Sequence, residues 1–508
     1  VIKGSELEYM KTQHPFIDRT SLVIVGDHVT LESGTGCVHT APGHGIEDFV
    51  VCKNYPEIPI IVPVDAKGRL TEEAGMFAGL TTEEANKPIA LHLEKIGALF
   101  ALKKIEHQYP HCWRCHKPVI FRATSQWFCS VDDFKDDAVK AAEDVKWFPE
   151  WGKDRLQSMV KERADWCISR QRKWGVPIPV VYCQDCGKEI IDNDIMMKVS
   201  KIFGEEGSDA WFAHDTEYFL PEGFKCPHCG SAKGFDKEKD IMDVWFDSGS
   251  SHAAVCARRK YLKVPADVYL EGADQYRGWF QSSLLTSVAG GHGAPYKQII
   301  THGWTVDGEG KKMSKSLGNG IAPQEIISKY GADILRLWVA SADYHADIRI
   351  SPEILKQISD NYRKLRNTAR YCLSNLYDFD PDKDMVSNDE LEELDKYALM
   401  KLDEVIKIAR DAFEVYDYHT AAHSLHNFCV VEMSNFYFDV LKDRLYTSAP
   451  QSKTRRAAQT VLYKVLDALT LVLTPILAFT ADEIWQSMPH DKSRNGESPL
   501  FNEIPQPD

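Results

Sequence analysis

The chain has 508 residues, 44% of them hydrophobic and 27% charged, which is typical of an ordinary soluble protein of roughly two to five domains. Its net charge of −15 excludes a surface that is basic throughout, so any nucleic-acid site must be a local basic patch. No apolar run is long enough to span a membrane. Because Val1 is not an initiator methionine, we expect the chain to be a piece of a longer protein.

The first 105 residues contain short strand-like runs, such as 21–25 and 58–64, separated by proline and glycine. This pattern predicts a compact β-rich domain. Within it, residues 34–49 read GTGCVHTAPGHGIEDF, in which glycines allow a ligand to approach the backbone and His39, His44 and Asp48 supply polar groups. By itself, a glycine-rich loop with two histidines is more often structural than catalytic.

Thirteen cysteines, with three pairs spaced CxxC, favour zinc sites in a reducing compartment over a disulfide framework, so we expect a cytoplasmic protein. The first pair, Cys112 and Cys115, supplies half of a tetrahedral zinc site. Its other ligands must come from elsewhere, and His111 and His116 are weak candidates.

Residues 165–179 read DWCISRQRKWGVPIP, with basic side chains between two tryptophans. Such a segment can bind the backbone and the end of a nucleic acid. The alternative is that the tryptophans pack under arginine stems.

A second set of cysteines is complete in itself: Cys183, Cys186, Cys226 and Cys229 form two CxxCG knuckles separated by a polar loop. This spacing predicts a Cys₄ zinc ribbon. Its role is structural, because four thiolates leave no open coordination position.

From residue 243 the pattern becomes α/β. Residues 243–251 indicate a strand that ends in a polar turn, residues 268–280 a strand that runs into a helix, and residues 299–304 a third strand. Ligands bind beyond the carboxyl ends of strands in such sheets, which draws attention to Glu271 and Asp274. Capping or solvation is the alternative role for both carboxylates.

Residues 311–319, KKMSKSLGN, lie between glycine-rich turns and are expected to form a mobile loop. Lys312 and Lys315 can place two ammonium groups on a polyphosphate and stabilise charge that develops as phosphate leaves. The alternative is a solvated basic loop.

The rest of the chain is predicted to be helical, starting at Pro323 and continuous from about residue 351. One apolar stripe runs from Leu402 to Phe413 and another from Val461 to Leu473, and residues 480–483 are expected to form a capping box. Two such stripes predict a helical bundle.

Residues 311–319 contain KMSKS, which resembles the second nucleotide-binding motif of class I aminoacyl-tRNA synthetases. Residues 271–280, EGADQYRGWF, and residues 165–179 resemble the isoleucyl enzymes of that class, and residues 34–49 resemble the editing-domain segment of the isoleucyl, valyl and leucyl enzymes. The resemblance implies a multidomain α/β plus α fold. Its parts are the end of a β-rich editing domain (1–108), a return to the catalytic core with the first zinc knuckle (109–180), a zinc ribbon (181–240), the second half of a Rossmann-like catalytic domain (241–350) and a truncated anticodon-binding helical bundle (351–508).

The resemblance implies ATP-dependent activation of isoleucine with Mg²⁺, transfer to tRNA(Ile), and hydrolytic editing of valyl-tRNA(Ile). The catalytic lysines would be Lys312 and Lys315. The implied ATP-binding residues are Lys315, Ser314, Ser316, Met313 and His302. The implied aminoacyl-adenylate-binding residues are Glu271, Gly272, Asp274, Gln275, Trp279 and Trp245. The implied editing residues are His39, Thr40 and Asp48, with Asp48 holding the α-amino group of the substrate. Lys364, Arg366 and Arg370 are candidates for contact with tRNA phosphate, and a solvated basic face is the alternative.

Two expected motifs are absent from the sequence: the HIGH motif, which is the first nucleotide motif of the family, and the threonine-rich segment of the editing site. We therefore expect the isolated chain, as a monomer, not to activate isoleucine. The alternatives are a piece of a valyl-tRNA synthetase and a non-catalytic or trans-editing tRNA-binding module.

Overall fold

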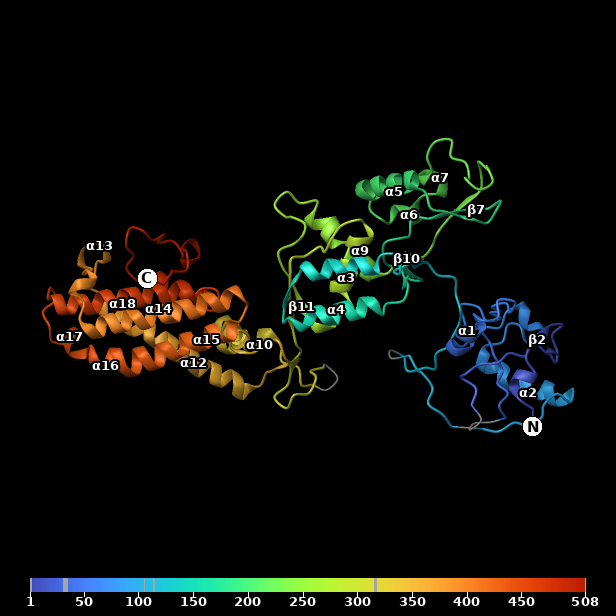
Figure 1. The fold of residues 1–508 in the computed structure, drawn as a ribbon, viewed down its shortest axis with the longest axis horizontal. Coiled ribbons are helices and arrows are strands. Elements are labelled where there is room, and N and C mark those ends of the chain that lie inside the picture. The colour runs from blue at the N-terminus through green and yellow to red at the C-terminus, as the bar shows by residue number, and fades with distance from the viewer. Residues whose placement is uncertain (1, 31–34, 105, 113–114, 315–317, 508) are drawn as a thin grey trace. The chain divides into compact units, whose positions relative to one another are not determined.

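The computed structural model describes residues 2–30, 35–104, 106–112, 115–314 and 318–507, and the chain divides into two units, Val1–Trp127 and Phe128–Asp508 (Figure 1). Each unit is described by itself. Lys315, Ser316, Trp113 and Arg114 lie outside the described residues.

The first unit has little regular secondary structure in its described residues. Strands β1 (Lys11–Gln13) and β2 (Thr20–Leu22) form an antiparallel pair, followed by helices α1 (Ile46–Cys52) and α2 (Thr82–Lys95). The prediction of a β-rich domain is wrong for this part, because residues 58–64 contribute one bridge, between Val64 and Leu70, and no strand. Pro59 and Pro63 explain this difference, since proline has no N–H to donate to a ladder.

The second unit begins with the sheet that positions the site. Strand β12 (Gln298–His302) lies between β11 (Tyr269–Gly272) and β4 (Lys146–Phe148), and both pairs are parallel. Helices α3 (Lys135–Ala141), α4 (Trp151–Lys161) and α9 (Trp279–Ala289) contribute to one buried core with β11 and β12. The predicted strand into helix over 268–280 and the predicted strand at 299–304 are both confirmed.

The prediction for residues 243–251 is wrong. After the short strand β10 (Ile241–Met242), the chain forms helix α8 (Val244–Gly249). Asp243 accepts a hydrogen bond from the backbone N–H of Trp245 and so caps this helix. The apolar run after Asp243 suggested a strand, but the cap decides in favour of a helix.

Small two-stranded pairings complete this region. Strand β10 pairs with β6 (Ser169–Arg170), β3 (Phe128–Cys129) pairs with β5 (Trp166–Cys167), and β13 (Thr305–Val306) pairs with β14 (Ile348–Arg349).

The segment from 181 to 237 has its own sheet and core. Strand β7 (Val181–Cys183) lies between β8 (Glu189–Ile190) and β9 (Phe235–Lys237), both antiparallel to it. Helices α5 (Asn193–Glu206), α6 (Ala210–Ala213) and α7 (Thr216–Phe219) pack around the fully buried Trp211.

The remaining residues form the predicted helical bundle, in which the long helices lie side by side (Figure 1). The helices are α10 (Pro323–Tyr330), α11 (Ala332–Ser341), α12 (Pro352–Asn375), α13 (Pro381–Asp384), α14 (Glu393–Glu414), α15 (Tyr418–Asn427), α16 (Phe438–Val440), α17 (Lys442–Tyr446), α18 (Lys453–Leu473) and α19 (Ala478–Trp485). The two predicted apolar stripes lie on α14 and α18 and contribute to one core. Among the described residues, no helix combines the length and the apolarity that crossing a bilayer requires.

The predicted capping box at residues 480–483 is wrong. Helix α19 begins earlier, at Ala478, and Thr480 lies inside it. Both the N–H and the hydroxyl of Thr480 donate to the Asp333 carboxylate, at 2.7 and 2.6 Å. The threonine therefore joins α19 to α11 instead of starting a helix.

Candidate active site

The ends of β11 and β12 bring several predicted residues together. Because the two strands are parallel and in register, Glu271 lies beside Thr301 and Gly272 beside His302. A Cβ atom on Gly272 would lie 2.9 Å from an Asp274 oxygen and 3.4 Å from the His302 ring. Glycine therefore allows these two polar side chains to converge at the strand ends, where ligands bind in such sheets.

Gln275 positions the start of α9. Its side-chain oxygen accepts a hydrogen bond from the backbone N–H of Trp279 at 2.8 Å, and its amide donates to Asp274 at 3.4 Å. A Cβ atom on Gly278 would lie 2.5 Å from the Gln275 oxygen and 2.9 Å from the Trp245 ring. Gly278 thus lets the Trp245 ring and the Gln275 oxygen approach the same point of the backbone.

Two contacts hold the ring of Trp279, one on its face and one at its indole N–H. It stacks on Tyr269 with the ring centroids 3.9 Å apart, and its indole N–H donates to the carbonyl of Ser248 at 3.0 Å. Trp245 is 41% exposed. The structure therefore holds one tryptophan rigidly and leaves the other with an open apolar surface.

Asp243 connects this region to the segment 165–179. Besides capping α8, the buried carboxylate accepts a hydrogen bond from the Trp166 indole at 3.0 Å and pairs with Arg170 at 2.9 Å. Sequence reasoning missed this residue. An aspartate directly before an apolar helix start is the signal that identifies it.

Asp247, one turn into α8, has a perturbed carboxyl group. Desolvation, followed by the negative charge of Asp243, raises the pKa of Asp247 to about 6. Burial disfavours the ionised form of a carboxyl group, and a like charge nearby acts in the same direction.

Asp307 and Asn319 hold the base of the segment 311–319, which carries Lys312 and Lys315. The carboxylate of Asp307 accepts hydrogen bonds from the backbone N–H groups of Glu309 and Lys311 and from the Asn319 amide. The Asn319 oxygen in turn accepts from the N–H of Ser314 at 3.0 Å. The hydrogen bond from Asn319 is the main cause that lowers the pKa of Asp307.

Lys312 is placed close to the strand ends. Its ammonium nitrogen lies 5.6 Å from the centre of the Trp304 ring, and Trp304 follows His302 by two residues. Met313 packs against the core of the bundle. The predicted partners Lys315 and Ser316 fall outside the described residues, so their positions stay a prediction.

The four predicted ribbon cysteines come together. The sulfur atoms of Cys183, Cys186, Cys226 and Cys229 all lie within 4.8 Å of one another. The distance from Cys183 to Cys229 is 3.6 Å and that from Cys186 to Cys226 is 3.8 Å. A tetrahedral zinc ion with Zn–S bonds of about 2.3 Å requires S···S distances of about 3.8 Å, so the residues fit zinc.

The electrostatics of the four thiols also fit a cation. Burial acts to raise the pKa of Cys226, but the backbone N–H groups of Cys229 and His228 outweigh it and lower this pKa to about 6. The N–H of Ser231 acts to lower the pKa of Cys229, but desolvation and the neighbouring thiols raise it to about 12. Four thiolates so close together need a positive charge between them.

The first CxxC pair is different. The N–H of His116 donates to the carbonyl of Cys112 at 2.8 Å, and the N–H of Cys112 donates to the carbonyl of Lys117 at 2.9 Å. In the described part of the chain, however, no group of three or more ligating side chains includes Cys112 or Cys115. The weak candidates His111 and His116 do not complete a site there.

The glycine-rich loop leads into α1, and Asp48 lies in the first turn of this helix. Its carboxylate accepts the N–H of Ala41, next to Thr40, at 3.0 Å. His39 is exposed, and the His44 ring bonds to the carbonyl of Phe121 at 2.8 Å. The loop thus folds back on Asp48.

Comparison with known proteins identifies the family. A family model described as "tRNA synthetases class I (I, L, M and V)" matches residues 2–351. The chain belongs to this family. A second model, "Anticodon-binding domain of tRNA ligase", matches residues 395–508, which lie in the bundle.

Individual relatives agree with this result. The isoleucine–tRNA ligase of Caldicellulosiruptor bescii is 61% identical over 486 residues, covering 96% of this chain and 53% of that protein. The isoleucine–tRNA ligase of Thermoanaerobacter pseudethanolicus is 58% identical over 506 residues, covering 100% of this chain and 54% of that protein. The chain therefore spans about half the length of the curated relatives it matches.

Solved structures support the fold. Methionyl-tRNA synthetase of Mycobacterium tuberculosis in complex with methionyl-adenylate has a TM-score of 0.53 and 20% sequence identity, covering 74% of this chain and 65% of that chain. A second structure of this enzyme, also bound by methionyl-adenylate, gives a TM-score of 0.54 at 18% identity, covering 78% of this chain and 69% of that chain. At these identities the likeness concerns the fold.

Proposed function

We propose that the chain forms part of an isoleucine–tRNA ligase, with the strand-end cluster as its adenylate site. The observation that carries this proposal is the convergence of Gly272, Asp274 and His302 at the ends of β11 and β12, with Trp245 and Trp279 beside them. The similarity to curated isoleucine–tRNA ligases supports isoleucine as the amino acid.

In the proposed first step, a carboxylate oxygen of isoleucine attacks the α-phosphorus of ATP. A P–O bond forms, the bond to the bridging oxygen breaks, and pyrophosphate leaves as aminoacyl-adenylate is produced. Lys312, with Lys315, stabilises the negative charge on the leaving pyrophosphate, and Mg²⁺ accompanies the ATP. In the second step, the acyl group passes to a hydroxyl at the 3′ end of tRNA(Ile), and AMP leaves.

Each cluster residue has a proposed role. Glu271 and Asp274 contact the adenylate, and Gln275 keeps the first turn of α9 in place. The Trp245 ring supplies the apolar surface for the aliphatic side chain. His302, at the neighbouring strand end, contacts ATP together with Met313, Ser314 and Ser316.

Discrimination against valine is proposed to need hydrolytic editing. Isoleucine exceeds valine by one methylene, which contributes only about 0.8 kcal/mol on burial. One oxygen of Asp48 is held by the N–H of Ala41, which fixes the carboxylate where it can pair with the α-ammonium group of a misacylated tRNA. His39 and Thr40 would line this second site.

The Cys₄ cluster is proposed to hold zinc in a structural role. With four thiolate ligands no coordination position is left for a substrate, so the ion contributes folding energy to β7, β8 and β9.

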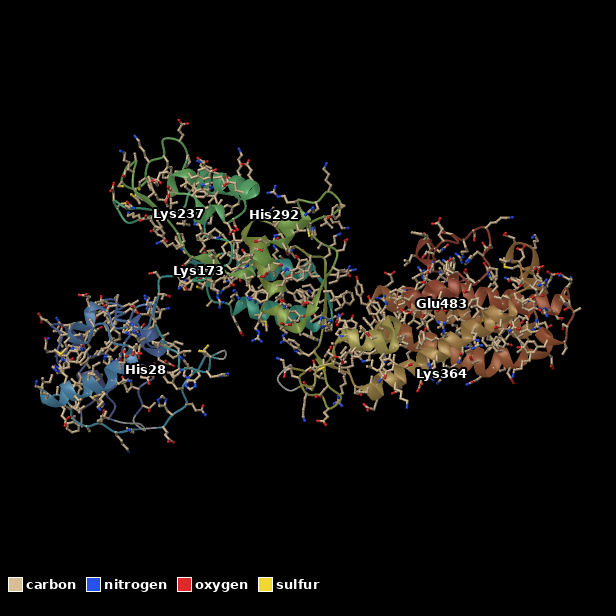
Figure 2. All side chains as sticks on the ribbon, turned by 180° about the vertical axis from the view of Figure 1, so that it is seen from behind. His28, Lys173, Lys237, His292, Lys364 and Glu483 are labelled. Carbon is tan, nitrogen blue, oxygen red and sulfur yellow. The ribbon has the colours of Figure 1, made fainter. Side chains whose placement is uncertain are left out.

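The bundle is proposed to bind tRNA. Arg366 is a poor candidate for phosphate contact, because both of its terminal nitrogens donate to Glu483 at 2.7 Å. Lys364 and Arg370 remain exposed, and Lys364 and Glu483 are labelled in Figure 2. A monomer in the cytoplasm is the setting that we propose for this reaction.

A chimera tests the proposed function. These 508 residues would replace the matching segment of the Caldicellulosiruptor bescii ligase, and ATP–pyrophosphate exchange would be measured with isoleucine, valine and leucine. We expect exchange that prefers isoleucine, and loss of exchange by at least about a hundredfold in the Lys315→Ala variant, since removal of a transition-state contact costs about 3 kcal/mol.

The isolated chain serves as the matched control and is expected to show no exchange. Exchange that prefers valine would contradict the proposal in favour of a valyl enzyme. A well-folded chimera without any exchange would leave a non-catalytic tRNA-binding module as the better reading.

A further inference from the structure

The turn between α14 and α15 contains a tyrosine in an unusual backbone conformation. Helix α14 ends at Glu414, and Tyr416, two residues later, has a φ of 60°. Its N–H donates to the carbonyl of Phe413 at 3.1 Å, and the N–H of Asp417 donates to the carbonyl of Ala412 at 2.8 Å, so this turn closes the helix end. Glycine usually occupies such a left-handed position after a helix, because a Cβ atom strains the backbone there. A tyrosine at this position indicates a role for its side chain that glycine cannot fill.

The side chain of Tyr416 reaches the start of the central strand of the sheet. Its hydroxyl donates to Oε1 of Gln298, the first residue of β12, at 3.3 Å. Its ring packs edge-on against Phe148 of the neighbouring strand β4, with the ring centroids 5.0 Å apart. The turn of the bundle is thus attached to the sheet.

The backbone of Tyr416 is connected to the opposite end of the same strand through Tyr344. The Tyr344 hydroxyl donates to the carbonyl of Tyr416 at 2.9 Å. The carbonyl of Tyr344 accepts the N–H of Gly303 at 2.8 Å, and Gly303 directly follows His302, the last residue of β12. Burial raises the pKa of Tyr344 to about 12, so its hydroxyl stays a hydrogen-bond donor at neutral pH. One bundle residue therefore contacts β12 at its start and, through Tyr344, just beyond its end.

The segment after β12 is closely fitted to the residues that follow Tyr344. A Cβ atom on Gly303 would lie 2.4 Å from the backbone carbonyl of Ala346, so only glycine allows this approach. The N–H of Trp304 donates to the Asp347 carboxylate at 2.8 Å, and the carbonyl of Trp304 accepts the N–H of Ile348 at 2.8 Å. We therefore expect a displacement of Tyr344 to move Gly303 and Trp304 with it.

Trp304 connects this segment to a lysine of the proposed adenylate site. Its ring centre lies 5.6 Å from the ammonium nitrogen of Lys312, which is the range of a cation–π contact. The next strand, β13, contains Val306, which forms an antiparallel bridge with Lys312 itself. The side chain and the backbone of Lys312 are thus both held by the segment that Tyr344 anchors.

We propose that Tyr344 and Tyr416 are positioning residues for adenylate formation: through them, the helical bundle holds Lys312 where pyrophosphate leaves. This inference rests on the proposed function, in which Lys312 stabilises the negative charge on the leaving pyrophosphate. A charge-stabilising group contributes only when it is correctly placed before the reaction, and a displacement of about 1 Å can cost about a hundredfold in rate. Neither tyrosine contacts a substrate in this scheme, so the effect of both passes through Lys312.

ATP–pyrophosphate exchange in the chimera with the Caldicellulosiruptor bescii ligase tests the inference. Tyr344→Phe removes the hydroxyl that joins the strand end to the bundle, and we expect it to lower kcat about tenfold. Tyr416→Gly relieves the backbone strain, since glycine adopts a positive φ freely, but it removes both side-chain contacts, so we expect a similar loss.

Tyr371→Phe is the matched control. The Tyr371 hydroxyl also donates to a carbonyl, that of Phe438 at 3.0 Å, but this hydrogen bond lies within the bundle. The variant therefore loses the same kind of contact without affecting the strand end. We expect its exchange rate to equal that of the parent chimera.

A double-mutant cycle separates positioning from a general loss of folded protein. In the Lys312→Ala background, Tyr344→Phe should reduce kcat by less than about twofold, because the group that Tyr344 positions is already gone. A loss of folded protein would reduce the rate equally in both backgrounds. Hydrogen exchange in the 508-residue chain gives an independent measurement: Tyr344→Phe should increase exchange at residues 303–306 and leave α14 and α18 unchanged.

Two results would overturn the inference: a parent-level kcat in both Tyr344→Phe and Tyr416→Gly, or the same fold loss from Tyr344→Phe with and without the Lys312 side chain. Either result leaves the proposed function standing, because the parent chimera is active in both cases. A parent chimera without exchange is a different result, which contradicts the proposed function and this inference with it.

Discussion

Asp243 shows how much of the site depends on one buried side chain. Its carboxylate caps α8, accepts the Trp166 indole and pairs with Arg170, so that three segments share one anchor. The chain segment with the exposed Trp174 and the helix with Trp245 both begin close to this anchor. The anchor therefore fixes the starts of these two segments relative to each other.

Ionisation of the partly buried Asp247 carboxyl lowers the free energy of unfolding, and a substitution can remove this effect. Its pKa, about 6, lies above the ordinary carboxyl value of 3.8, so the folded chain holds the proton more tightly than the unfolded chain. The penalty for ionising Asp247 is absent below about pH 4 and fully present above about pH 6. A shift of this size corresponds to about 3 kcal/mol for a buried group, and partial exposure reduces this to about 1 kcal/mol.

We therefore predict that Asp247→Asn raises the free energy of unfolding by about 1 kcal/mol at pH 8 and has no effect at pH 4. Urea unfolding of both proteins across this range measures the difference. Asp209→Asn, which changes an exposed carboxylate that lines the same groove as Asp247, is the control for the loss of one negative charge. A constant difference at all pH values would show that ionisation of Asp247 is not the cause.

At the scale of elements, the sequence predicts what depends on local spacing. The four ribbon cysteines converge because the CxxC spacing is itself the geometry of a metal knuckle. The strand into helix at 268–280 follows from an apolar run and a polar turn. Two elements differ from the prediction for local reasons: Asp243 caps a helix at 244–249, and Pro59 and Pro63 keep residues 58–64 from forming a strand. A distant partner decides at Thr480, which donates to Asp333 instead of starting a helix, and no local pattern contains that contact.

The segment 181–237 gives an element-scale prediction about metal. Its strands have two or three residues each, so we expect a metal ion held by the four cysteines to contribute to their order. We predict about one zinc ion per chain by elemental analysis. Removal of zinc by a chelator should increase hydrogen exchange in β7, β8 and β9, and leave α14 and α18 protected.

Two serine variants separate a metal effect from a general loss of stability. Cys226→Ser removes a ligand and should lose the zinc together with the protection of β7 to β9. Cys256→Ser removes a thiol outside the cluster and should keep both. Retention of full protection in metal-free protein would show that the fold of this segment does not depend on zinc.

At the scale of the whole molecule, the buried core is distributed unevenly. The hydrophobic clusters of Phe128–Asp508 extend through the sheet, the ribbon and the bundle, whereas the cluster identified in Val1–Trp127 centres on Val51, Cys52 and Tyr55. A unit that buries little apolar surface offsets little of the conformational entropy that folding removes. The two units should therefore differ greatly in intrinsic stability.

We predict that residues 128–508, expressed alone, fold and keep the main thermal transition of the whole chain within about 2 °C, because their cores lie within this unit. Residues 1–127 alone should show no cooperative transition in calorimetry. Limited proteolysis of the whole chain provides an independent measurement, since the less stable unit should be cut first and residues 128–508 should accumulate. If the shorter protein instead aggregates or unfolds well below the whole chain, the first unit contributes contacts that the second requires.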